Sequence, residues 1–217
     1  AKNVWQRPNP IDEKKFNLII RKQKYQLREQ LTNFSEDDIV LSYVATFWDN
    51  KNQLFLLKVL SELDEKYKLL LVGVIKKERN DYYQRVLSDI ECLNLQNRVQ
   101  IKTEFINNPQ EYMALSDVYC FPSKHEGLGT PILESQACGA PILANKLDGV
   151  TDKWIKDGGE ICVLDEKLWS ERIKKVLEIP KEILEKNKIN LLKISNTEKI
   201  DKQYIKYFKE LKNANSN

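Results

Sequence analysis

The residues with the clearest chemical potential lie in one short segment, Pro122-Ser123-Lys124-His125-Glu126-Gly127-Leu128-Gly129-Thr130-Pro131-Ile132-Leu133-Glu134. Glu126 and Glu134 lie eight residues apart in it. The two glycines between them, Gly127 and Gly129, allow the backbone to approach a ligand closely. Thr130 suits the cap of a helix and Pro131 its first position. A glycine-bearing loop that leads into a helix presents backbone N–H groups and the positive end of the helix dipole. This pattern therefore indicates an anion site, most naturally for phosphate.

Glu134 has two interpretations at this stage. A capping box would need Glu at the third helical position, and with Thr130 as the cap Glu134 falls at the fourth. Favourable charge at the start of a helix remains an alternative to ligand contact, and the residues alone leave both open. His125 is the only histidine. No Ser or Cys is spaced to form a triad with it, so we expect a loop residue.

The elements that must position these residues alternate between short apolar strands and helices. We predict strands over 39–46, 67–74, 99–102, 117–121, 140–144 and 160–164, with helices over 52–63, 81–93, 109–115, 131–138 and 151–156. Residues 12–34 indicate an amphipathic helix or two, and residues 166–213 two helices broken near Pro180. The alternation predicts an α/β fold, a single Rossmann-like, doubly wound parallel sheet. We divide the chain into a linker (1–12), the sheet domain (13–165) and C-terminal helices that pack on it (166–217).

Ligands of such a sheet bind at the carboxyl ends of its strands. Three loops there hold unusual residues: Phe47–Lys51, Phe105–Asn108 and Pro122–Thr130. Lys51 alone would ordinarily be a solvated residue, but a cation in its loop could face a phosphate at the 127–130 helix start. The turn after the second strand, at Gly73, lacks the GxGxxG fingerprint of dinucleotide-binding domains. A dehydrogenase is therefore the least favoured of three hypotheses.

Composition excludes several classes of function. The 217 residues carry 35 Lys and Arg against 32 Asp and Glu, a scattered surplus that argues against a nucleic-acid partner. Four cysteines without a CxxC pair make a zinc site improbable and favour reduced thiols in the cytoplasm. No apolar run reaches the roughly 18 residues of a membrane span. Anionic lipid at the inner membrane face is a secondary interpretation of the basic residues near the start, namely Lys14, Lys15, Arg21, Lys22, Lys24 and Arg28.

Residues 123–142 resemble the E-x7-E signature of retaining glycosyltransferases of the group 1 (family 4) type. Weaker agreement extends outward. Asn9-Pro10-Ile11-Asp12 is similar to the family's linker into its C-terminal domain, and residues 44–52 and 148–158 are similar to two of its other segments. The resemblance spans roughly residues 9–165.

The resemblance implies a role for each matching residue. Glu134 would bind the ribose hydroxyls of a nucleotide, and Lys51 its diphosphate. Glu126 would be the catalytic residue, in contact with the transferred sugar and its developing positive charge. The remaining predicted donor contacts are the backbone at Gly127, Leu128, Gly129 and Thr130 for phosphate and sugar, and Phe105 and Ile106 near the base. Thr46 stands where the family usually has Arg, so one phosphate-binding cation is missing.

The same resemblance implies the C-terminal half of a GT-B fold, with the N-terminal acceptor-binding domain missing from this chain. We therefore expect the donor-binding domain of a retaining enzyme that transfers a sugar from a UDP-sugar or GDP-sugar to a saccharide or lipid-linked acceptor, without a metal or other cofactor. The chain alone would be inactive. The alternative hypothesis is a non-catalytic nucleotide-binding or partner-binding subunit of a split glycosyltransferase.

Overall fold

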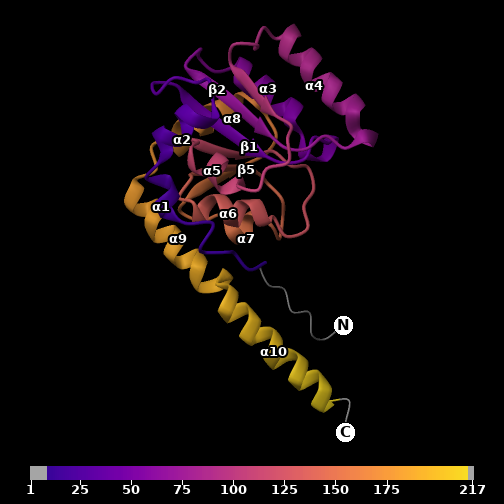
Figure 1. Ribbon diagram of the computed structural model, residues 1–217, viewed down its shortest axis with the longest axis vertical. Helices are drawn as coiled ribbons and strands as arrows, with labels where there is room; N and C mark the ends of the chain where they lie inside the picture. Colours follow the sequence, from indigo (N-terminus) through magenta and orange to yellow (C-terminus); the bar gives the residue numbers. More distant parts are fainter. Residues whose placement is uncertain (1–8, 215–217) are drawn as a thin grey trace.

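Six parallel strands form one sheet in the part of the chain that the structure, a computed structural model, describes, residues 9–214 (Figure 1). Their order is β3-β2-β1-β4-β5-β6. The strands are β1 (Ile39–Val44), β2 (Tyr67–Val72), β3 (Val99–Lys102), β4 (Val118–Phe121), β5 (Ile142–Asn145) and β6 (Gly159–Cys162). The predicted α/β class and Rossmann-like, doubly wound parallel sheet are confirmed. Of the predicted linker, residues 1–8 lie outside the described part, as do residues 215–217 of the C-terminal segment.

Helices cover both faces of this sheet because the crossovers run in opposite directions from β1 and β4. One face carries α3 (Gln53–Ser61), α4 (Asn80–Cys92) and α8 (Glu166–Leu177). The other carries α1 (Leu18–Arg21), α2 (Lys24–Leu31), α5 (Pro109–Ala114), α6 (Thr130–Ala137) and α7 (Thr151–Trp154), with α9 (Lys181–Ser195) packed on α6. Two short 3-10 turns, η1 (Asp49–Lys51) and η2 (Lys77–Arg79), lie in loops.

The core lies between the sheet and its helices, as the continuous apolar strands predict. Leu69, Leu70 and Leu71 of β2 are all fully buried, which requires cover on both faces of the strand. On the α3–α8 side, Phe55 meets Trp169 edge-on, with ring centroids 5.1 Å apart. Three of the four cysteines are buried and all four are free thiols.

The C-terminal segment departs from the prediction of two helices. It forms three, because a break at Asn196 separates α9 from α10 (Thr197–Ala214), which projects from the rest of the molecule (Figure 1). A distant segment docks at this break. The backbone N–H of Ile11 donates to the Ser195 carbonyl over 3.0 Å, and the Thr197 hydroxyl donates to the Ile11 carbonyl over 3.0 Å. Local helical periodicity could not reveal a break stabilised by a tertiary contact.

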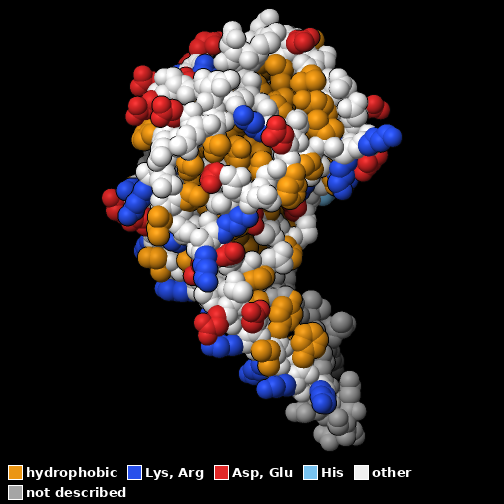
Figure 2. Space-filling model, in the orientation of Figure 1, with side chains coloured by type: hydrophobic (Ala, Val, Ile, Leu, Met, Phe, Trp, Pro, Cys, Tyr) orange, Lys and Arg blue, Asp and Glu red, His pale blue; other side chains and the backbone are white. Residues whose placement is uncertain are grey.

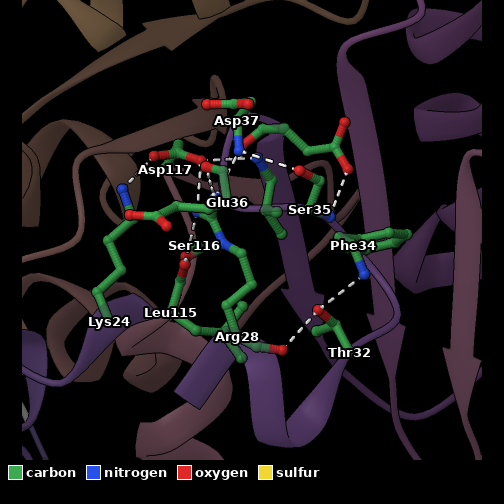
Figure 3. Close-up of polar contacts among 12 residues, drawn as sticks. Lys24, Arg28, Thr32, Phe34, Ser35, Glu36, Asp37, Leu115, Ser116 and Asp117 are labelled. Atoms are coloured by element: carbon green, nitrogen blue, oxygen red, sulfur yellow. Dashed lines mark hydrogen bonds and ion pairs between the residues drawn. The ribbon is translucent and has the colours of Figure 1, made fainter. Parts of the chain in front are cut away.

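A buried ionic cluster fastens α2 to the amino ends of β1 and β4 (Figure 3). Arg28 is only 2% exposed, and its guanidinium donates to the Asp117 carboxylate over 2.8 Å and to the Asp38 carbonyl over 2.8 Å. The ammonium of Lys24 also pairs with Asp117, whose carboxylate accepts the N–H of Val40 over 2.7 Å. The cluster thus bonds one helix to two strands.

This cluster bears on the predicted contact with membrane lipids. Of the six basic residues near the start, only Lys14 and Lys22 are exposed. Arg21, like Lys24 and Arg28, turns inward, where its guanidinium donates to the Ala114 carbonyl over 2.6 Å. Of the six cations that suggested this contact, two therefore remain exposed to it. Within residues 9–214, no helix is both long and apolar enough for a membrane crossing.

Candidate functional site

The predicted site lies where the topology of the sheet reverses. β1 and β4 are hydrogen-bonded neighbours, but the chain leaves them toward opposite edges of the sheet. In doubly wound folds this switch point opens a crevice at the carboxyl ends of the two strands, and ligands bind there. The loop after β1 (residues 45–52) and the loop after β4 (residues 122–129) therefore face each other across it.

Hydrogen bonds tie these two loops into one unit. The Lys124 N–H donates to the Asn50 carbonyl over 2.9 Å, and the Asn50 side-chain amide donates to the His125 carbonyl over 2.9 Å. At the rim, the Lys124 ammonium pairs with Asp49 over 2.8 Å. Because the bonds run in both directions between the loops, their side chains are held in register.

Ser123 anchors the second loop to the sheet. Its hydroxyl lies 2.7 Å from the buried Tyr43 hydroxyl, and its carbonyl accepts the Asn145 amide over 2.9 Å. Burial raises the pKa of Tyr43 far above its ordinary value, so this phenol stays neutral. The loop therefore starts from a point attached to both β1 and β5.

Lys51 and Glu126 form an ion pair between these two loops. Their side chains are 22% and 13% exposed, so both charges are largely shielded from solvent while one side stays open. Lys51 is presented by η1 and Glu126 by the loop after β4. Any anion that approaches Lys51 must share it with the Glu126 carboxylate.

Gly129 sets the start of α6. It has φ +65°, and a Cβ there would lie 2.8 Å from Val150 Cγ1, so a larger residue is excluded. Gly129 is the N-cap residue, whereas the sequence favoured Thr130 for that position and Pro131 for the first helical one. Thr130 is instead the first helical residue. The loop is braced by the Trp154 indole, which donates to the Leu128 carbonyl over 3.0 Å.

The shifted cap changes the interpretation of Glu134. It becomes the fifth residue of α6, beyond the first turn, where a capping box is impossible and the helix dipole acts weakly. Its carboxylate is half-buried and accepts no hydrogen bond from the part of the chain that the structure describes. Burial raises the pKa of Glu134, and the nearby Lys15 ammonium partly lowers it. A half-buried carboxylate without a hydrogen-bond donor is typical of functional sites.

The loop after β3 carries the residues predicted to lie near the base. Phe105 is 79% exposed, the largest exposed fraction among the exposed large apolar side chains of the described residues, while Ile106 is half-buried. The Lys15 ammonium donates to the Asn107 carbonyl over 2.6 Å. Lys15 therefore joins this loop to the segment that precedes α1.

Two residues contribute less than their positions suggested. Thr46 is half-buried, and its carbonyl accepts the Gln53 amide over 3.1 Å, so it supplies backbone contacts and no cation. The side chain of His125 is exposed. In the described ranges, no three His, Cys, Asp or Glu side chains gather in a way that suits a metal ion.

Sequence reasoning missed several residues that shape the site. Lys15 reaches Asn107 across 92 positions, and the Asn9 amide donates to the Thr130 hydroxyl across 121 positions, over 2.8 Å. Asn9 lies in the linker segment noted for its family resemblance, but nothing in its sequence surroundings indicates a contact with α6. Lys15 was noted only as one of several basic residues.

Comparison with known proteins assigns the chain to a family. Residues 24–191 match the glycosyl transferases group 1 family, which is most of the chain. The protein therefore belongs to the group 1 glycosyltransferases, and the resemblance to group 1 noted from the sequence is confirmed.

Relatives with related names span more than this chain. CapH, a capsular polysaccharide biosynthesis glycosyltransferase of Staphylococcus aureus, is 29% identical over 157 residues, covering 70% of this chain and 43% of CapH. A UDP-Gal:alpha-D-GlcNAc-diphosphoundecaprenol alpha-1,3-galactosyltransferase of Escherichia coli is 26% identical over 147 residues, covering 65% and 36%. The chain thus spans less than half the length of these relatives.

Solved structures share the fold. Sucrose-phosphate synthase of Thermosynechococcus elongatus superimposes with a TM-score of 0.85 and 22% identity, covering 99% of this chain and 54% of that one. HepE of Anabaena, crystallised with UDP and glucose, gives 0.81 and 21%, covering 90% and 55%. The chain corresponds in fold to about half of each of these two proteins.

Proposed function

We propose that this chain is the donor-binding part of a retaining glycosyltransferase, which takes a sugar from a UDP-sugar or GDP-sugar. One observation carries the proposal: Lys51, Glu126 and the start of α6 meet at the switch point of the sheet, with Glu134 one turn farther along the helix. A cation, free N–H groups and two carboxylates suit a diphosphate that is linked on both sides to hydroxyl-rich rings.

Each group takes a role that matches its chemistry. Lys51 and the N–H groups from Gly127 to Thr130 bind the diphosphate and stabilise its charge as it leaves. Glu134 accepts the ribose hydroxyls, and the exposed ring of Phe105, beside Ile106, receives the base. Glu126 contacts the transferred sugar and stabilises positive charge at its reacting carbon.

These residues supply the charge that the reaction needs without a metal. Lys51 and the helix start face the leaving diphosphate, which is the place a divalent cation would otherwise take. We therefore propose metal-independent transfer. The acceptor would bind to a further domain, since the chain spans less than half the length of its relatives CapH and the galactosyltransferase.

The names of the relatives support an acceptor class. CapH is named for capsular polysaccharide biosynthesis, and the Escherichia coli enzyme acts on a diphosphoundecaprenol-linked sugar. We propose a saccharide or lipid-linked saccharide as the acceptor here. The buried free thiols of Cys120, Cys138 and Cys162 support a reducing, cytoplasmic location, with a lipid-linked acceptor drawing the enzyme to the inner face of the membrane.

A second candidate is a non-catalytic nucleotide-binding or partner-binding subunit. The observation that favours it is Thr46, which places no cation beside Lys51. Such a subunit would bind nucleotide but would not support transfer when joined to an acceptor-binding domain. Sugar transfer by this chain joined to an acceptor-binding domain, abolished by the Glu126→Gln substitution, would exclude the non-catalytic subunit.

Calorimetry with UDP, GDP and their sugars tests the proposed function. We expect binding by one of the two nucleotide series in the presence of a chelator. Glu134→Ala removes the acceptor of the ribose hydroxyls and should weaken binding about 10- to 100-fold, in line with the roughly 1.5–3 kcal/mol of a hydrogen bond to a charged group. The matched control is Glu91→Ala, an exposed carboxylate on α4.

Two results would overturn the assignment. One is the absence of binding by every nucleotide and nucleotide sugar tested. The other is full affinity in Glu134→Ala, which would remove the ribose role of Glu134 even if nucleotide binds elsewhere on the sheet.

A further inference from the structure

A cavity of about 710 Å³ opens at the amino ends of β4 and β5, the edge of the sheet opposite the donor crevice. Asp117 and Pro141, which stand just before these two strands, both line it. The helices α1 and α2 form one side, and the α8–α9 connection with the start of α9 forms another. Its volume falls within the roughly 300–1,000 Å³ of small-molecule sites. The cavity shares no residue with the crevice loops, so it is a separate feature of the fold.

Apolar side chains from the surrounding helices make up much of the cavity lining. They are Leu18, Ile19, Tyr25, Leu177, Ile179 and Leu184. Ile19 is 71% exposed and Tyr25 is 55% exposed, so apolar surface reaches the solvent at this place. Gly139, with φ +75°, lets α1 approach the end of α6, because a Cβ there would collide with Leu18. Apolar surface left open in this way is typical of a binding site.

The charged residues of the lining are unequal in sign. Four are cations and two are carboxylates: Arg21, Lys22, Lys24 and Lys181 against Asp117 and Glu185. Asp117 already pairs with Lys24, and it accepts the Arg28 guanidinium from inside the protein over 2.8 Å (Figure 3). The charge of this carboxylate is therefore matched by two cations before the rest of the lining is considered.

Arg21 carries positive charge to the cavity without a carboxylate partner. Its guanidinium donates to the Ala114 carbonyl over 2.6 Å and to the Ser116 carbonyl, which fix its position and leave its charge in place. Within residues 9–214, neither Arg21 nor the exposed Lys22 and Lys181 form an ion pair. In Figure 2 basic and apolar side chains lie together on the side of the molecule where Figure 1 draws α1 and α9. The cavity thus combines apolar walls with a surplus of positive charge.

We propose that this cavity binds a single-chain anionic amphiphile, a molecule with one phosphate or carboxylate head and one apolar chain. The chain packs against the apolar side chains of α1 and α9, and the head pairs with Arg21 and the lysines. Charge complementarity favours an anion over a neutral amphiphile, and the apolar walls favour a chain over a free anion. The inference does not depend on the proposed function, because the cavity and the crevice lie at opposite ends of the strands.

Calorimetry with dodecyl phosphate, kept below its micelle-forming concentration, tests the proposal on the full chain. We expect one molecule to bind. Dodecyl maltoside has the same chain with a neutral head, and inorganic phosphate has the head without the chain. Each should bind at least about tenfold more weakly than dodecyl phosphate. Equal affinity for dodecyl phosphate and dodecyl maltoside would overturn the role of the cations.

Variants of the lining locate the bound molecule. Leu184→Trp fills part of the cavity and should weaken binding of dodecyl phosphate at least about tenfold. Ile189→Trp is its matched control, because Ile189 also lies on α9 but is 57% exposed and outside the lining. It should bind like wild type. Unchanged affinity in Leu184→Trp, or an equal loss in Ile189→Trp, would overturn the proposal.

The charge is tested at the exposed lysines, where a substitution leaves the buried contacts of the fold intact. The double variant Lys22→Met with Lys181→Met should lose most of the preference for dodecyl phosphate over dodecyl maltoside. Lys14→Met removes an exposed cation outside the lining and should keep that preference. A preference that survives in the double variant and is lost in Arg21→Met would assign the head to Arg21 alone; survival in both would overturn the proposed pairing.

Sedimentation with vesicles distinguishes the two sources of such a molecule. Co-sedimentation with phosphatidylglycerol vesicles, lost in Leu184→Trp, would identify a membrane lipid. Binding of dodecyl phosphate without co-sedimentation would identify a free amphiphile, and the absence of both would overturn the proposal. UDP and GDP should bind Leu184→Trp and wild type equally. If wild type binds neither nucleotide, the proposed function fails and the amphiphile measurements still decide this inference.

Discussion

The Lys51–Glu126 pair places opposite charges where a diphosphate is proposed to bind. Lys51 is the cation of the crevice, and in the free protein its charge is matched by Glu126. A nucleotide must therefore compete with a carboxylate that the enzyme itself supplies. One side of the pair stays open, so a diphosphate can reach Lys51 at the expense of part of its pairing with Glu126.

Glu126→Gln should strengthen binding of UDP or GDP without an attached sugar. The substitution frees Lys51 and removes repulsion between a carboxylate and the diphosphate, so we expect about a three- to fivefold gain in affinity. Lys51→Met should weaken the same binding about tenfold or more. Calorimetry measures both.

Asp49→Asn provides the matched control for this prediction. It makes the same change of charge in the neighbouring Lys124–Asp49 pair, which lies at the exposed rim. Its affinity should stay near that of wild type. Weaker binding of the bare nucleotide by Glu126→Gln would show that Glu126 supports the diphosphate site rather than opposing it.

Glu134 should lower the stability of the folded protein at neutral pH. Burial raises its folded-state pKa above the unfolded value of roughly 4.3, so over that interval the folded state binds more protons than the unfolded state. Stability contributed by this group is therefore lost as the pH rises. Glu134→Gln should unfold at a higher urea concentration than wild type at neutral pH, and this gain should vanish near about pH 4.

The exposed Glu91→Gln serves as the control and should change neither midpoint nor pH dependence. A lower urea midpoint for Glu134→Gln at neutral pH would mean that the carboxylate stabilises the fold. In that case its burial would not indicate a binding role.

At the scale of elements, the carboxyl and amino ends of β1 and β4 have different roles. Their carboxyl ends carry the crevice, with Lys51 and Glu126. Their amino ends carry the buried cluster in which Asp117 bonds Arg28, Lys24 and the backbone of Val40 (Figure 3). The cluster fixes α2 to the sheet without entering the crevice.

Asp117→Ala should therefore destabilise the protein and leave the site intact. Removing one member of a buried ion pair leaves the opposite charges buried without a partner. The free energy of unfolding, measured with urea, should therefore fall by about 3–5 kcal/mol. The affinity of the folded variant for nucleotide should equal that of wild type. Glu198→Gln, which breaks the exposed pair with Lys202 on α10, should leave the urea midpoint unchanged. A loss of nucleotide affinity in folded Asp117→Ala would contradict this prediction. It would show that the cluster at the amino ends of the strands influences the site at their carboxyl ends.

At the scale of the molecule, a strap of residues 9–16 joins parts that are remote in sequence. It docks at the α9–α10 junction, and its Asn9 and Lys15 side chains donate to Thr130 and Asn107, beside the proposed donor site. From that junction α10 extends away from the sheet domain, with Ile200 buried at its root and Ile205 and Phe208 56% and 62% exposed (Figures 1 and 2). The strap therefore connects the start of α10 with the proposed nucleoside pocket.

The sequence by itself determined the class of fold and the centre of the site. Apolar strands alternating with helices require a sheet covered on both faces, and the 123–142 segment carries its chemistry within twenty adjacent residues. Both are local patterns. Lys51 could be predicted as well, because the carboxyl ends of neighbouring parallel strands meet at one edge.

Only the tertiary structure decided the contacts that depend on distant segments. It broke the C-terminal helix at Asn196, moved the cap of α6 to Gly129, and turned Arg21, Lys24 and Arg28 inward. It also brought Lys15 to the loop after β3. Each of these results depends on which surfaces meet once the sheet is covered. The physical reason is that burial and charge pairing depend on residues that are close in space but distant in the sequence. The neighbouring sequence therefore does not determine them.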